Sequence, residues 1–234
     1  MKPTFLTRVL IAVTALAISG LRAEEPNIRV CVQLIELPHL ELTKLLGNTG
    51  AKTHPAAIAL IRDGKAKLID SSVMTSIPNQ KATVASIGER IYPTEFDPDL
   101  PRFQPPRTPP NWLPAFPVFH LGRPAVPAAW DIRNTGMTFE AESSYDEPLG
   151  KIAVRLAPEW VGMTTPTTWV DYVDEWGDAS DRHPTFTSLG CTTHLTLVPG
   201  RFALVVVLTP QPEPPPPAVA RKVLVFARAD LPRQ

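Results

Sequence analysis

Prolines are concentrated in two short parts of this chain. The sequence holds 28 prolines in 234 residues, well above the usual frequency of about one in twenty. Much of the excess lies in residues 93–127 and in residues 210–217. Proline fixes φ and has no backbone N–H, so such runs form neither a helix nor a central strand. We therefore expect an extended arm at 93–127 and a stiff connector at 210–217.

The N-terminal residues have the order of a secretory signal peptide. Two basic residues precede an apolar run at residues 9–18, and Ala23 follows small and turn-forming residues. This run is roughly half as long as the ~20 residues of a membrane-spanning helix. We predict a signal peptide over residues 1–23, with Ser19 or Gly20 as alternative ends, and export to the periplasm or outer membrane.

The remaining residues suffice for one domain with a hydrophobic core. We expect residues 24–92 to form its first half and residues 128–234 its second half, with the arm between them. Formal charge is balanced, with 23 basic and 23 acidic residues. Such a chain has no general field that attracts nucleic acid, so no nucleic-acid partner is expected. Membrane association stays open, although not through a transmembrane helix.

Alternating apolar and polar residues predict strands over most of the chain, and leucines at helical spacing predict a short helix at 40–46. A second apolar turn or helix is expected at 54–61. The strands are expected at residues 28–37, 67–69, 73–76, 82–87, 137–142, 151–156, 191–198, 202–208 and 223–229. Residues 137–156 form a hairpin in this interpretation, and residues 191–208 form another strand pair. These elements predict a mainly β fold with one or two short helices, whose antiparallel sheets are sandwich-like or open.

The order of several segments resembles a known family. Asn79-Gln80-Lys81-Ala82 looks like an asparagine-glutamine-x-alanine turn, and Gly136 begins the strand that opens the main hairpin. The segments that carry the resemblance are 63–75, 79–84, 89–95, 133–140, 156–159, 184–193, 199–200 and 222–226. In this order they resemble the C-terminal domain of the bacterial secretins, the ring-forming outer-membrane proteins of type II and type III secretion systems. The resemblance implies protein partners in a secretion or pilus-type machinery of the envelope.

Two departures from the family pattern bear on function. The glycine-glycine-leucine turn of the family is missing, since Leu208-Thr209-Pro210 leads directly into the proline cluster. Few residues separate the expected signal peptide from the first strand. The hairpin strands at 137–142 and 151–156 are also shorter than the about 9–11 residues of a membrane-crossing strand. We therefore expect a truncated, stand-alone relative that is a compact monomer or small oligomer.

No pattern of catalytic residues, cofactor-binding residues or metal ligands stands out. The sequence has no Gly-x-Ser-x-Gly elbow, no phosphate-binding glycine loop and no His-Glu-x-x-His helix. His183, Cys191 and His194 do not have the spacing of a zinc site, and the acids of residues 171–181 lack that of a calcium loop. We predict no enzymatic activity, no metal and no cofactor; an exported hydrolase is the weakest of three interpretations.

Three aromatic residues mark a candidate interaction surface. Trp169, Tyr172 and Trp176 would share one face if this segment formed a helical turn, and the alternative is that the rings cover the edge of a sheet. Cys31 and Cys191 are the two cysteines, and an oxidising compartment makes them a candidate disulfide. Their expected faces differ, which argues against the bridge.

The sequence therefore leaves two main functional hypotheses. The first is a non-enzymatic, exported secretin-like protein, an accessory or remnant component of a secretion or pilus-type assembly that acts by protein–protein contacts. The alternative is an exported cell-envelope binding module that recognises a ligand through the proline-rich arm and the loop from Trp169 to Trp176.

Overall fold

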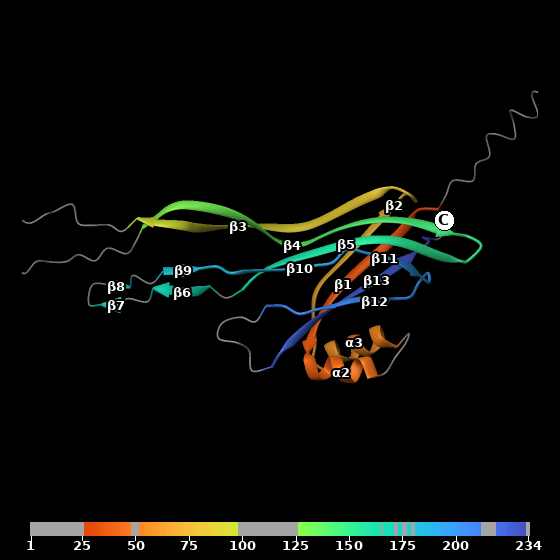
Figure 1. Cartoon of the computed structure of the whole chain (residues 1–234), viewed down its shortest axis with the longest axis horizontal. Coiled ribbons are helices and arrows are strands. Elements are labelled where there is room, and N and C mark those ends of the chain that lie inside the picture. The colour runs from red at the N-terminus through yellow and green to blue at the C-terminus, as the bar shows by residue number, and fades with distance from the viewer. Residues whose placement is uncertain are drawn as a thin grey trace, which may run out of the picture.

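The computed structural model describes residues 26–47, 52–97, 126–164, 166–170, 173–174, 177–178, 181–211 and 219–232. The expected signal peptide, the middle of the arm at residues 98–125 and most of the proline connector lie outside the described residues. The described part is mainly β, with antiparallel sheets and two short helices (Figure 1). The predicted fold class is confirmed.

One sheet has four strands in the order β12-β13-β1-β2. The strands are β1 (Ile28–Pro38), β2 (Lys67–Ser76), β12 (Ala203–Leu208) and β13 (Arg221–Asp230). β1 and β13 pair over ten residues and form the centre of the sheet, so the first and last described strands are neighbours. Both are rich in Val, Ile and Leu, as strands covered on both faces usually are.

The second sheet has five strands. Its main order is β10-β5-β4-β3, and β11 also pairs with β5. The strands are β3 (Lys81–Asp97), β4 (Val126–Asp146), β5 (Lys151–Met163), β10 (Phe186–Gly190) and β11 (Thr193–Leu197). β10 and β11 pair with successive parts of β5, and the break between them lies opposite residues 157–158.

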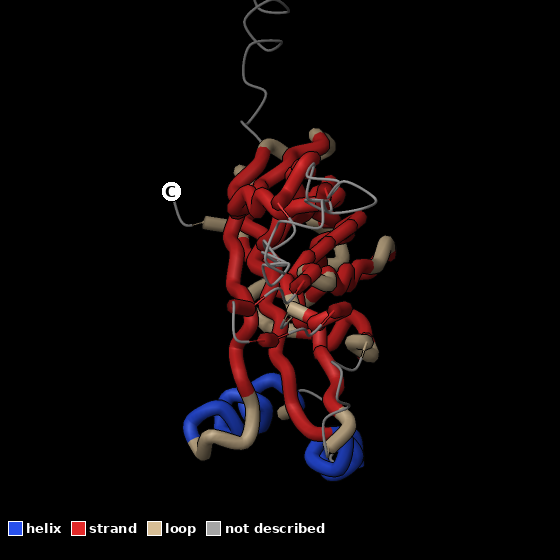
Figure 2. The backbone as a smooth tube through the Cα atoms, turned by 90° about the vertical axis from the view of Figure 1, so that its left-hand side faces the viewer, coloured by secondary structure: helices blue, strands red, loops and turns tan. Residues whose placement is uncertain are grey.

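The two sheets pack face to face around the main core. Fully buried side chains of this core include Ile28 and Val30 of β1, Phe139 of β4 and Leu156 of β5. The helices α2 (His39–Gly47) and α3 (Thr53–Arg62) cover one end of the other face of the four-stranded sheet (Figures 1 and 2). There Leu42, Leu45 and Ala57 form a second core with residues of β1 and β13. The fold thus has three layers: a sheet, a second sheet and a pair of helices.

Several strands are longer than the sequence pattern predicted. The strands expected at 67–69 and 73–76 are one strand, β2. β3 continues through Pro93 to Asp97 and β4 begins at Val126, so both ends of the expected arm belong to paired strands. β3 is tolerant of Pro93 because it lies at the edge of its sheet, where a missing N–H breaks no ladder.

The predicted lengths of the main hairpin were wrong as well. β4 has 21 residues and β5 has 13, and the two pair from Gly136–Val161 to Asp146–Lys151. The argument from short strands against a membrane-crossing sheet therefore does not hold. β5 continues past Pro158 because this residue lies at the break between β10 and β11. Neither described helix, with 9 and 10 residues, is long enough to span a bilayer.

The predicted strand pair at 191–208 is also wrong. β11 pairs with β5 in the five-stranded sheet, whereas β12 pairs with β13 in the four-stranded sheet. The turn at Pro199-Gly200 therefore carries the chain from one sheet to the other. Gly200 has φ +79°, a conformation that glycine adopts without the steric cost of a side chain. Sequence alternation shows that a strand exists, but it does not show which strand lies beside it.

Candidate protein-contact surface

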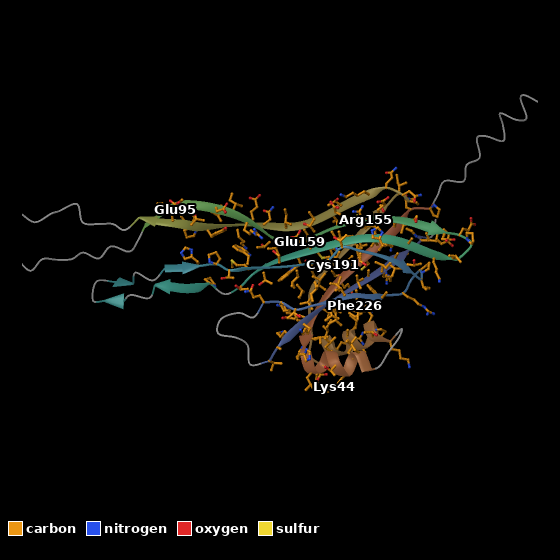
Figure 3. The ribbon with its side chains drawn as sticks, in the orientation of Figure 1. Lys44, Glu95, Arg155, Glu159, Cys191 and Phe226 are labelled. Atoms are coloured by element: carbon orange, nitrogen blue, oxygen red, sulfur yellow. The ribbon has the colours of Figure 1, made fainter. Side chains whose placement is uncertain are left out.

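The most unusual surface of the molecule is a two-stranded ribbon, residues 87–97 of β3 and 126–136 of β4. β4 pairs with β5 only as far as Gly136, and beyond that point it pairs with β3 alone. Figure 1 shows this ribbon running past the ends of the other strands of its sheet, and Glu95 marks its far part in Figure 3. The ribbon therefore projects from the packed sandwich.

Gly136 lies where the ribbon leaves the sheet. It has φ +120°, and a Cβ atom at this position would lie 2.1 Å from the backbone oxygen of Ser86. Only glycine combines this backbone conformation with so close an approach of the neighbouring strand. In addition, the Thr135 hydroxyl donates a hydrogen bond to the Gly88 carbonyl at 3.0 Å. These contacts hold β3 and β4 close together at the point where the ribbon leaves the sheet.

One face of the ribbon is apolar and open to solvent. Ile91 lies opposite Ile132, and Pro93 lies opposite Trp130, so all four share this face. The exposed fractions of Ile91, Trp130 and Ile132 are 65%, 59% and 55%, and Ile87 on the same face is 50% exposed. The polar pair Glu89 and Asn134 separates Ile87 from the others on this face. Single exposed apolar residues are common, but a group such as Ile91, Pro93, Trp130 and Ile132 is typical of a binding surface.

The opposite face of the ribbon is anchored to β10. Tyr92 donates a hydrogen bond to Asp131 at 3.2 Å, and its ring lies 5.3 Å from that of Phe186. Arg133 lies over the same Phe186 ring, 5.9 Å from its centroid, and donates to the Ser188 hydroxyl at 3.5 Å. These contacts leave the apolar face as the open one.

The outer edge of β3 is also open within the described residues, because β3 ends the sheet and no described strand pairs with that edge. A long strand with unpaired N–H and C=O groups can pair with a strand of another chain. Pro93 interrupts this row of donors and limits uncontrolled pairing. The ribbon thus offers both an apolar face and a partly blocked strand edge.

Charged residues cover the outer face of the five-stranded sheet beyond the ribbon. Lys81 forms an ion pair with Glu140 at 2.6 Å. Glu142 lies opposite Arg155, and Arg155 lies opposite His194 on the next strand. Arg155 and Glu159 project from β5 in Figure 3. Burying such a face in lipid would cost several kcal/mol per unpaired charge, so contact with water or with a polar partner is favoured.

The two cysteines are free and lie in different sheets. Cys31 of β1 is opposite Arg228, on the face that carries the helices, and burial raises the pKa of its thiol. Cys191 follows β10 in the other sheet, where its N–H donates to the Pro158 carbonyl at 3.2 Å and burial also raises its thiol pKa. The two thiols are therefore unbridged in this structure.

The predicted aromatic surface at Trp169, Tyr172 and Trp176 is only partly described. Trp169 belongs to the short strand β6 (Thr167–Val170), which pairs with β9 (Asp181–His183), and β7 (Val173–Asp174) pairs with β8 (Gly177–Asp178). The hypothesis of a helical turn is therefore wrong. Tyr172 and Trp176 lie outside the described residues.

The remaining candidate residues form no site within the described chain. No group of three or more His, Cys, Asp or Glu residues that could hold a metal is found there, and His183, Cys191 and His194 do not make one. The ribbon itself was not identified from the sequence. Its signal was the spacing of Ile87 and Ile91, which places two apolar side chains on one face of the strand just before the prolines.

Comparison with known proteins gives similarity to solved structures only. No protein-family model and no curated protein matches this sequence. The chain is similar to the InvG secretin domain of the Salmonella SPI-1 injectisome, with 11% identity and a TM-score of 0.48 over 96% of this chain and 68% of that one. It is also similar to the type II secretin GspD from enteropathogenic Escherichia coli, with 9% identity and a TM-score of 0.48 over 96% of this chain and 74% of that one. A third similar structure is Aeromonas hydrophila ExeD, with 10% identity and a TM-score of 0.47 over 96% of this chain and 52% of that one. Identities of 9–11% with TM-scores below 0.5 do not assign the chain to a family.

Proposed function

We propose that this protein is an exported, non-enzymatic, secretin-like protein of the periplasm or outer membrane. It acts by protein–protein contacts as an accessory or remnant component of a secretion or pilus-type assembly. The observation that carries the proposal is the ribbon of residues 87–97 and 126–136, with its exposed apolar face and open strand edge. Such a surface is costly to leave in water and is suited to a protein partner.

The sequence supports the choice of assembly. The ordered segments from residue 63 to residue 226 resemble the C-terminal domain of the secretins, and the missing glycine-glycine-leucine turn at Leu208-Thr209-Pro210 favours an accessory role over that of a channel. The charged outer face of the five-stranded sheet favours a polar environment on that side. The alternative, a ligand-binding module built from the arm and the Trp169 to Trp176 loop, depends on residues that are mostly outside the described part.

Site-specific photo-crosslinking in the producing cell tests the proposal. A photoreactive amino acid replaces Ile91 on the ribbon or, as a matched control, Leu149 in the turn before β5; both side chains are 65% exposed. We expect crosslinks from position 91 to envelope proteins of a secretion or pilus machinery, and none of these from position 149. The same products from both positions, or no product from position 91, would contradict a contact role for the ribbon.

Export is tested separately, because the ribbon could bind a partner in any compartment. Cell fractionation and N-terminal sequencing of the purified protein should place it in the envelope, with a mature start near Glu24. An intact Met1 on a protein recovered from the cytoplasm would contradict the proposed location.

A further inference from the structure

A cavity lies between the two sheets, away from the ribbon's apolar face. Its volume is about 790 Å³, within the range of about 300–1,000 Å³ that is usual for small-molecule sites. One wall comes from β1, β2 and β13 of the four-stranded sheet, and the other from β3, β4, β5 and β10 of the five-stranded sheet. The strands of the two sheets cross at an angle in Figure 1.

The inner part of the cavity is apolar. Trp160 lines it, and the indole lies so close over Gly162 that a Cβ atom there would be 2.0 Å from the ring. Ile69, Leu189 and Val223 line the cavity too, and all three also contact the main core. Gly162 thus leaves room for the indole to lie flat along β5. The result is an apolar floor with one large aromatic surface.

Charged residues line the same cavity, and their net formal charge is positive. Lys67, Arg90 and Arg221 are cationic and Glu36 is anionic, which gives three positive charges less one, or +2. The Arg221 Nε atom already pairs with Glu36 at 2.8 Å. No ion pair is described for Lys67 or Arg90 within the described residues. These two cations, from opposite sheets, are therefore available to an anion.

We propose that this cavity binds a single-chain amphiphile, an apolar chain with an acidic head group. The chain lies against Trp160 and the apolar residues of the floor, and the head group binds Lys67 and Arg90. The site combines the two requirements of such a ligand, because apolar burial provides most of the affinity and the cations orient the head. Carboxylate and phosphate heads share this chemistry, and both are tested.

Calorimetry on the full mature chain tests the proposal with dodecanoate and dodecyl phosphate, each below its micelle concentration. Dodecanol has the chain without the charge, and hexaglutamate has charge without the chain. We expect saturable binding of at least one acidic amphiphile, and binding of dodecanol and of hexaglutamate weaker by about tenfold or more. Equal binding of dodecanol, equal binding of hexaglutamate, or no saturable binding of either acid would overturn the proposal.

Two sets of variants locate the site. The double variant Lys67→Gln, Arg90→Gln changes only exposed side chains. It should lower the affinity for the acidic amphiphile about fivefold to tenfold. As a control, Lys151→Gln replaces an exposed lysine outside the cavity and should change this affinity less than about twofold. Ligand-induced change in tryptophan fluorescence should be lost in Trp160→Phe and kept in Trp130→Phe. An unchanged affinity of the double variant, or a fluorescence change that survives in Trp160→Phe, would place the ligand elsewhere.

Discussion

The clearest test of the ribbon geometry is the substitution Gly136→Ala. Gly136 has φ +120°, and an alanine Cβ would lie 2.1 Å from the Ser86 carbonyl oxygen and 3.1 Å from the Ile87 Cα. The backbone conformation alone costs a non-glycine residue about 1–3 kcal/mol. The contact adds to this cost, because it involves backbone atoms of the paired strand that cannot rotate away. We expect the free energy of unfolding to fall by about 3 kcal/mol.

Gly88→Ala provides a matched control in the same ribbon. Gly88 does not have a positive φ in the glycine-favouring range, and the atom nearest to an added Cβ is the Thr135 hydroxyl oxygen at 4.0 Å. This substitution should be neutral or stabilising by up to about 1 kcal/mol, because alanine restricts the unfolded chain.

Thermal unfolding followed by circular dichroism measures the difference. For a chain of this size each kcal/mol corresponds to about 2–4 °C, so Gly136→Ala should lower Tm by about 6–12 °C while Gly88→Ala changes it little. Photo-crosslinking from position 91 should decrease in the same variant, because the junction that projects the ribbon is disturbed. Equal Tm values for the two variants would refute the geometry described at Gly136.

Three further outcomes follow from buried and half-buried residues in the described part of the chain. Burial lowers the pKa of His54, so its unfolded-state value of about 6.5 is the higher one and the unfolded chain takes up the proton first. The contribution of neutral His54 to the free energy of unfolding is therefore complete above about pH 6.5 and is lost as the pH falls below it. This decrease in stability with falling pH should be smaller in His54→Gln but unchanged in His39→Gln, because the His39 ring is exposed. Because Cys31 and Cys191 are free, gel mobility and Tm should be the same with and without reductant, and a shift on reduction would contradict their separation. Phe139→Ala removes a fully buried ring and should destabilise the protein by about 3–5 kcal/mol in denaturant unfolding, whereas a loss below about 1 kcal/mol would contradict its central position.

The sequence alone determined the local structure of most elements. Alternation identified β1 and the hairpin of β4 and β5, and leucine spacing identified α2, because side-chain period reports which residues face a core. Mainly β antiparallel structure with short helices follows from these local signals.

Only the tertiary structure decided which elements are neighbours. The uninterrupted apolar run of β12 is the same whichever sheet it joins, so the change of sheet at Pro199-Gly200 was not predictable. The continuation of β3 through Pro93 depends on its position at an edge, which is a property of the sheet and not of the residue. The cavity likewise joins residues from segments far apart in sequence, such as Lys67 and Arg90 with Trp160. Local periodicity encodes the faces of strands, whereas long-range pairing and the angle between sheets bring the functional surfaces together.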